Sequence, residues 1–108
     1  MLKKQYRLPA HTKLQAPFSL RTPLFSVKIA KNGLPYNRFA FVVRKAVDKR
    51  AIRRNRMKRV IRSCIEELLG EMRQGYDMLF FLEKGIIEKH HGYLSQEIRK
   101  VLTEKGLI

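Results

Sequence analysis

The stretch that decides the fold is residues 48–75, DKRAIRRNRMKRVIRSCIEELLGEMRQG. Its apolar side chains recur every three or four residues, and they are Met57, Val60, Ile61, Cys64, Ile65, Leu68, Leu69 and Met72. That spacing places them on one face of a helix. Asp48 is a good N-cap residue, and Gly75 is a good helix terminator. The stretch therefore predicts one long amphipathic helix that runs from Asp48 to about Gln74.

Strand-like segments lie on both sides of this helix. Residues 24–31 and 38–45 alternate apolar and polar side chains, which is typical of strands. The turn-rich residues 32–37 between them predict a hairpin. Residues 76–82 are almost continuously apolar, as in a strand covered on both faces, and residues 94–105 have the apolar spacing of a last helix. This order of elements predicts an α+β fold, a small two-layer sandwich with the helices packed on one sheet.

The net charge of +15 is unevenly distributed along the chain. Residues 1–62 carry 18 of the 24 Lys and Arg residues but only one of the nine acids, Asp48. A protein that uses charge only for solubility mixes both signs, so this separation predicts a polyanionic partner. An anionic membrane surface attracts the same charge, but a membrane-surface helix needs its apolar face free. Here the apolar face is needed for the core.

Length and cysteine content indicate one intracellular domain. The chain is long enough for a single modest core, so we expect one domain over residues 1–108 that binds the polyanionic partner. The only cysteine, Cys64, lies on the apolar stripe and is expected to be a buried thiol, which favours a reducing compartment. No apolar run approaches the roughly 20 residues that cross a bilayer. We therefore expect a soluble, cytoplasmic protein that does not enter a membrane.

The charges of the predicted helix are reversed with respect to the helix dipole. Its first half is crowded with Lys and Arg, whereas Glu66, Glu67 and Glu71 lie in its second half. A helix dipole favours the opposite arrangement, and like charges four residues apart repel. For the free protein this predicts that Arg54→Ala relieves repulsion and does not harm the fold. A solvated charged face is the plainer interpretation, but phosphates against the first turns explain the arrangement better.

The same residues resemble a known family. Residues 54–62, RNRMKRVIR, are similar to the signature helix of bacterial ribonuclease P protein subunits. Residues 43–52, VRKAVDKRAI, resemble the strand and loop that lead into that helix. The start of the chain, LKKQYRL at residues 2–8, and Gly75-Tyr76-Asp77 are similar as well. The resemblance covers nearly the whole chain, and the combination is more specific than the Arg-Asn-Arg motif alone.

The resemblance implies the protein component of a ribonucleoprotein endonuclease. In this family the protein binds a large catalytic RNA through the signature helix, and the RNA, with Mg²⁺, removes the 5′ leader from precursor tRNA. Catalysis is thus expected to reside in the RNA, with no catalytic or metal-binding residue in the protein and no obligate protein partner. The family fold includes a βαβ crossover through the basic helix. By resemblance, the residues at the RNA contact are Lys45, Lys49, Arg50, Arg53, Arg54, Asn55, Arg56, Lys58, Arg59 and Arg62.

The family also presents a groove on its sheet to the leader. Its first helix usually carries two aromatic residues, four apart, that face this groove. The expected groove residues in this chain are Leu14, Phe18, Ser26 and Lys28. Pro17 disfavours a helix interior, so whether residues 10–22 form the family's first helix stays open, and Phe18 could equally be a core anchor.

Other functions remain open from the residues alone. A ribosomal or other structural RNA-binding protein without a part in catalysis has the same charge and fold class. A DNA-binding module needs a recognition helix that reads bases, whereas the arginines here suit phosphates. Conventional protein catalysis has little support, because the sequence has no phosphate-binding glycine loop or nucleophile elbow. His90 and His91 are expected to be a solvated pair in a loop.

Overall fold

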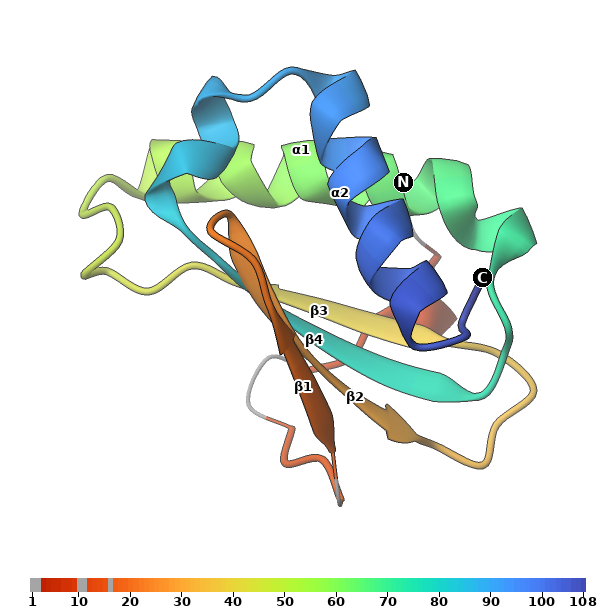
Figure 1. The fold of residues 1–108 in the computed structure, drawn as a ribbon. Coiled ribbons are helices and arrows are strands. Elements are labelled where there is room, and N and C mark those ends of the chain that lie inside the picture. Colours follow the sequence, from red (N-terminus) through yellow and green to blue (C-terminus); the bar gives the residue numbers. More distant parts are fainter. Residues whose placement is uncertain (1–2, 10–11, 16) are drawn as a thin grey trace.

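A computed structural model describes residues 3–9, 12–15 and 17–108 of the chain. In this part of the chain, a four-stranded sheet lies against two helices (Figure 1). The strands are β1 (Phe18–Arg21), β2 (Phe25–Lys31), β3 (Arg38–Val42) and β4 (Tyr76–Leu82). The helices are α1 (Ala51–Leu68) and α2 (His91–Glu104), and the 3-10 turns are η1 (Lys4–Tyr6), η2 (Leu69–Glu71) and η3 (Lys84–Glu88). Both helices cover the same face of the sheet, which confirms the predicted α+β two-layer sandwich.

The strand order is β1-β2-β4-β3, so the predicted hairpin between residues 24–31 and 38–45 is wrong. β4 lies between these two segments, antiparallel to β2 and parallel to β3. Two strand spacings amount to about 10 Å, a distance that the turn at residues 32–37 spans easily. The inner place of β4 fits its burial, because most of its residues are buried on both faces of the sheet. α1 therefore joins two parallel neighbours, β3 and β4, in the predicted βαβ crossover.

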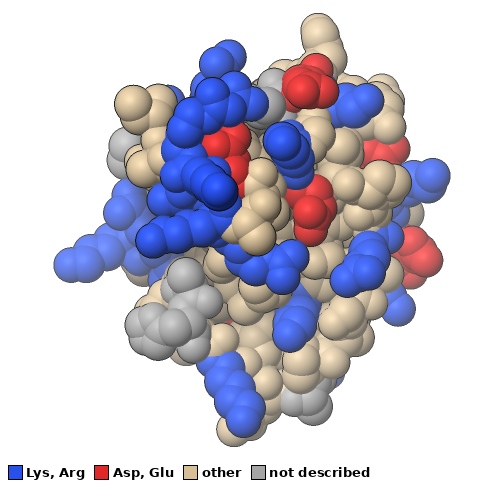
Figure 2. Space-filling view, turned by 90° about the vertical axis from the view of Figure 1, so that its left-hand side faces the viewer, with Lys and Arg blue, Asp and Glu red and all other residues tan. Residues whose placement is uncertain are grey.

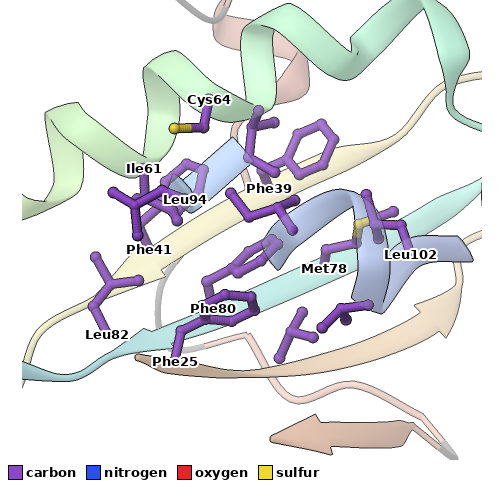
Figure 3. Packing of buried hydrophobic residues seen from close by; sticks show 14 of the residues in the cluster. Phe25, Phe39, Phe41, Ile61, Cys64, Met78, Phe80, Leu82, Leu94 and Leu102 are labelled. Carbon is purple, nitrogen blue, oxygen red and sulfur yellow. The ribbon is translucent and has the colours of Figure 1, made fainter. Parts of the chain in front are cut away.

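The core lies between the sheet and the two helices. The ring centroid of Phe80 lies 5.7 Å from that of Phe25 and 5.6 Å from that of Phe41, so three strands share one aromatic cluster (Figure 3). The buried side chains of α1 and of the segment after it are Met57, Ile61, Cys64, Ile65, Leu68 and Met72. The predicted apolar stripe is thus confirmed, with Val60 and Leu69 half-buried at its edges.

The boundaries of α1 differ from the predicted ones. The N-cap position is Arg50, so the prediction that Asp48 caps the helix is wrong. The Asp48 carboxylate accepts the backbone N–H of Arg50 in the loop, and no described side chain accepts a capping bond from a backbone N–H of the first turn. At the other end α1 stops at Leu68, several residues before the predicted end. The chain continues through η2. Met72, which follows η2, is buried in the core, and from there the chain leads to β4.

α2 begins at His91, three residues before the predicted start at Leu94. Its N-cap is His90, whose Nδ1 accepts a hydrogen bond from the Gly92 backbone N–H at 3.2 Å. Imidazole is not among the usual capping side chains, so the sequence pattern gave no sign of this start. The two histidines therefore form the beginning of a helix and not a loop pair.

The segment before β2 contains a strand that the sequence did not reveal. β1 pairs antiparallel with β2, and Phe18 lies opposite Ile29. The first helix of the family was one possibility for residues 10–22, which include β1. Residues 10, 11 and 16 lie outside the described residues, and within residues 12–15 and 17–22 no helix is present. On the sheet face away from the helices, Leu8 packs with Ala40 and Leu79, and Leu14, Val42 and Phe81 border this small cluster.

Candidate nucleic-acid interface

The basic surface lies around the start of α1. Residues 44–62, which comprise the loop after β3 and two-thirds of α1, carry ten Lys and Arg residues and one acid. Figure 2 looks onto this end of the molecule and shows Lys and Arg side chains gathered on one side of it. Within α1, all of which the structure describes, no acid lies in the first turn and no side chain caps it. The helix N-terminus therefore adds its positive potential and free N–H groups to the cations.

The single acid of residues 44–62, Asp48, is already hydrogen-bonded to neighbouring residues. The Asp48 carboxylate accepts hydrogen bonds from the Arg50 backbone N–H at 2.9 Å and from Arg53 Nε at 2.7 Å. The backbone bond from Arg50 and then the bond from Arg53 hold the pKa of Asp48 at about 2. The Asp48 side chain is only 4% exposed. Asp48 therefore shapes the loop and fixes Arg53, but it offers little negative charge to an approaching anion.

Arg54 connects α1 to the loop that precedes it. Its Nη1 donates hydrogen bonds to the carbonyl oxygens of Asp48 at 3.0 Å and Lys49 at 2.9 Å. The expectation that Arg54→Ala relieves repulsion without harm to the fold overlooked these bonds. Counting like charges along a helix does not show a side chain that folds back onto loop carbonyls. Arg54 consequently has a structural role, and its remaining guanidinium donors stay available for an anion.

Lys58 and Arg62 follow Arg54 at one-turn intervals on the same flank of α1. The Arg62 guanidinium carbon lies 5.6 Å from the centre of the Phe41 ring, in a cation–π contact that orients it. With Arg7, these two side chains line a pocket of about 170 Å³ beside β3. Arg7 reaches this place through a parallel bridge to β3. Periodicity carries no signal for such a bridge, so sequence reasoning missed Arg7.

A second group of cations surrounds a pocket of about 320 Å³ beyond the ends of β3 and β4. Its basic lining residues are Lys45, Lys49, Arg50 and Lys84. Sequence reasoning did not assign Lys84 to the basic surface. The parallel pairing of β3 and β4 points to it, because the residues that follow two parallel neighbours emerge at the same edge of the sheet. Four cations and one internally bonded acid make this pocket suitable for a phosphate group.

The remaining predicted contact residues lie on the outer side of α1. Asn55, Arg56 and Arg59 are exposed, and their side chains have no hydrogen bond or ion pair to another described residue. Their donors are therefore directed at solvent. The ten predicted residues thus do not share one face. Three lie around the loop pocket, three form the row on the β3 flank and three form this outer set, whereas Arg53 is bonded to Asp48.

The four predicted groove residues divide between two faces of the sheet. Ser26 and Lys28 lie on the face away from the helices, where Lys28 Nζ is 5.7 Å from the centre of the Phe81 ring. Leu14 packs at the same face. Phe18 faces the helices instead, because it is paired with Ile29 of the core, and Lys105 Nζ lies 5.4 Å from its ring centre. Phe18 is 36% exposed, so it is not a plain core anchor either.

The chemically reactive side chains do not form a catalytic or metal-binding group in the described part of the chain. Cys64 is fully buried, as predicted, and burial raises the pKa of its thiol. His91 Nε2 lies 3.4 Å from Ser63 Oγ and 3.6 Å from Glu67 Oε1. Both contacts use the same nitrogen, so they do not form a relay. Among the described residues, no three His, Cys, Asp or Glu side chains gather where they could hold a metal ion.

No helix in the described residues is long and apolar enough to span a membrane. The surface around α1 and the sheet combines two cationic pockets, a row of exposed basic side chains and a mixed polar and aromatic sheet face. This arrangement can bind a polyanion over an extended area and can stack unpaired bases.

Comparisons with known proteins agree with this chemistry. A family model described as Ribonuclease P matches residues 2–106. The ribonuclease P protein component of Microcystis aeruginosa is 35% identical over 72 residues, which cover 67% of this chain and 60% of that protein. The corresponding protein of Histophilus somni is 34% identical over 95 residues, covering 86% and 79%. The ribonuclease P protein structure from Thermotoga maritima has a TM-score of 0.73 and 26% identity, covering 82% and 84%. These matches favour the predicted family over the ribosomal alternative, and the chain belongs to the ribonuclease P protein family.

Proposed function

We propose that this chain binds a ribonuclease P RNA and assists the removal of the 5′ leader from precursor tRNA. The observation that carries the proposal is the concentration of cations in residues 44–62, where the only acid, Asp48, is already bonded to arginines. An RNA backbone offers phosphates at regular intervals. Several separate cationic groups on one surface suit such a ligand better than one isolated anion does.

The two cationic pockets supply the proposed contacts to the RNA backbone. Lys45, Lys49, Arg50 and Lys84 surround the loop pocket, and the helix N-terminus adjoins it. On the β3 flank, the Phe41 ring holds the Arg62 guanidinium in place, which reduces the entropy lost when a phosphate binds. The exposed donors of Asn55, Arg56 and Arg59 extend the contact along α1.

The sheet face away from the helices is the proposed site for the single-stranded leader. Ser26, Lys28 and Leu14 line this face, together with the half-buried ring of Phe81. A ring that can stack on a base and a nearby cation for its phosphate are the usual elements of single-strand binding. Phe18 is not included in this proposal, because it lies on the other face.

Catalysis is proposed to reside in the RNA, which would also hold most of the Mg²⁺. The described residues offer no three-ligand cluster for a metal, so the protein side chains would act on Mg²⁺ only by orienting RNA. The proposed location is the cytoplasm, whose reducing conditions suit the buried Cys64 thiol.

Reconstitution tests the proposal directly. The protein is combined with the ribonuclease P RNA of its own organism, and cleavage of a precursor tRNA is followed at low Mg²⁺. We expect the protein to stimulate cleavage by this RNA and to cleave nothing by itself. Cleavage by RNA-free protein contradicts the assignment of catalysis to the RNA. Failure of the folded protein to stimulate its RNA contradicts the proposed function.

A further inference from the structure

A pocket of about 310 Å³ lies at the other end of the molecule from the basic loop. It is lined chiefly by Tyr6, Pro35, Tyr36, Asn37, Leu69 and Gln74. These residues come from η1, the turn before β3, η2 and the loop between η2 and β4 (Figure 1). α1 has 18 residues and is therefore about 27 Å long. The pocket is thus separate from the loop pocket near the start of α1, whereas the pocket on the β3 flank lies closer, because its lining residues Arg7 and Phe39 are near Tyr6 and Asn37 in the chain. The volume of the pocket suits one planar group and not an extended ligand.

Two tyrosine rings form the most distinctive wall of this pocket. The ring centroids of Tyr6 and Tyr36 are 5.5 Å apart, and the ring planes meet at 69°. This edge-to-face arrangement stabilises both rings and leaves a ring face free to stack on a ligand. Both side chains are half-buried, so the rings are held in place before any ligand binds. A planar aromatic group is the ligand that this wall recognises best.

The polar wall of the pocket is already committed to internal hydrogen bonds. Asn37 donates from Nδ2 to the Arg73 carbonyl at 2.8 Å and accepts the Tyr76 backbone N–H at 2.8 Å. The Gln74 side chain accepts the Asn37 backbone N–H at 3.1 Å and donates to the Met72 carbonyl at 3.2 Å. These bonds fix the orientation of both amides and leave each with one further N–H and one further lone pair. We expect a base held here to be recognised chiefly by stacking, with little preference for its identity.

The charges next to the pocket favour an anionic ligand. Lys3 and Lys4 lie three and two residues before Tyr6 in the chain, Arg73 adjoins Gln74, and all three are exposed. Two acids near the pocket are neutralised by arginines in bidentate pairs. Glu71 accepts two bonds from Arg99, at 2.6 and 2.8 Å, and Asp77 accepts two from Arg38, at 2.8 and 2.7 Å. The unpaired charge around the pocket is therefore positive.

We propose that this pocket binds one unpaired nucleotide of RNA, whose base stacks on the Tyr6 and Tyr36 rings while its phosphate meets Lys3, Lys4 or Arg73. The inference extends the proposed RNA binding to a second, sequence-tolerant site and rests on it only in the choice of RNA as ligand. An RNA that occupies both ends of α1 has its position fixed along the helix. A proline-rich peptide is the other chemistry that an aromatic pocket of this kind takes, and the test below distinguishes the two.

The test is an NMR titration of the full chain with single-stranded pentanucleotides, oligo(A) and oligo(U). Resonances of residues 6, 36, 69, 70 and 74 report on the pocket, and those of residues 49–62 report on the basic surface. We expect both oligonucleotides to shift the pocket resonances with affinities within a few-fold of one another. Tyr36→Leu should weaken binding at the pocket by about fivefold to a hundredfold, whereas Tyr36→Phe, which keeps the ring, should stay within about twofold.

The matched control is Tyr93→Leu. Tyr93 is a 46% exposed tyrosine near the start of α2, with Lys89 Nζ 5.3 Å from its ring centre, and it does not line the pocket. We expect its loss to leave the pocket affinity unchanged, and thermal melts check that every variant folds. Pocket resonances that fail to shift with RNA, or that shift equally in Tyr36→Leu, overturn the inference. The same holds if only a proline-rich peptide shifts them. Normal binding of ribonuclease P RNA in that case leaves the proposed function intact.

Discussion

Arg53 donates a hydrogen bond from Nε to Oδ2 of Asp48 over 2.7 Å, and this contact ties α1 to the loop before it. Together with the Arg50 backbone bond, it lowers the pKa of Asp48 from its ordinary value of 3.8 to about 2. A depressed pKa means that the carboxylate stabilises the fold above pH 3.8, and that this stabilisation is lost as the pH falls through about 2.

The first prediction concerns this pH window. The difference in free energy of unfolding between wild type and Asp48→Asn should be constant near neutral pH and should shrink between pH 3.8 and about 2. Urea unfolding at a series of pH values measures it. Burial raises the pKa of Asp77, but hydrogen bonds from Arg38 and Asn32 lower it overall. Asp77 is present in both proteins, so its contribution to the pH dependence cancels in the difference. A difference that does not change down to pH 2 shows that Asp48 is not bound by the arginines.

The second prediction separates structural from RNA-binding arginines. Arg54→Ala removes two hydrogen bonds to loop carbonyls and should lower the free energy of unfolding by about 1 kcal/mol. Arg56→Ala changes an exposed side chain and should leave stability within about 0.5 kcal/mol. It should nevertheless weaken RNA binding by about 1–3 kcal/mol. Urea unfolding and filter binding on the same samples test both statements, and equal stability of the two variants contradicts the structural role of Arg54.

The local features of the fold could be predicted from the sequence, whereas its long-range pairings could not. The stripe from Met57 to Leu68 identifies α1 because helical periodicity depends on neighbouring residues only. The alternation in residues 24–31 and 38–45 revealed two strands but not their partner. Which strands pair depends on tertiary burial, and β4 displaced the expected hairpin because it is covered on both faces.

The basic surface shows the same division. Arg56 and Lys58 were identifiable from charge clustering and the matched signature, whereas Lys84 and Arg7 join the surface only through strand topology. Capping by the His90 imidazole and the burial of Asp48 by arginines depend on side-chain geometry. Propensity rules average over such contacts, and for that reason the helix boundaries were less accurate than the helices themselves.

The third prediction concerns the proposed leader face. Lys28→Ala removes the cation near the Phe81 ring, so the holoenzyme should bind precursor tRNA more weakly, by about 1 kcal/mol. Affinity for the ribonuclease P RNA and for mature tRNA should not change. Lys105→Ala is the matched control, because Lys105 also lies over an aromatic ring, Phe18, but on the helix side of the sheet. If both variants lose leader binding equally, the groove is not confined to the face that carries Lys28.

The fourth prediction tests the residue that strand topology adds to the basic surface. Lys84→Ala should weaken binding of ribonuclease P RNA and reduce the slope of log affinity against log salt by about one unit, if Lys84 meets one phosphate. Lys100→Ala removes an equal charge from the exposed side of α2 and serves as the control. A salt titration of both variants measures the slopes. Identical slopes for Lys84→Ala and wild type contradict a role for the loop pocket.

The fifth prediction tests whether the basic half of α1 is a defined site or one part of a diffuse attraction. Any protein with a net charge of +15 binds RNA at low salt, so the salt slope is more informative than affinity alone. Replacing Lys58 and Arg59 together by alanine should make the slope shallower by about one to two units, because each side chain is expected to meet a phosphate. Replacing Lys100 and Lys105, which are exposed in the acid-balanced C-terminal part, removes the same charge and should leave the slope almost unchanged. Diffuse attraction responds to total charge only, so it predicts that both double substitutions reduce the slope equally. Equal reductions would show that α1 is not the RNA-binding site.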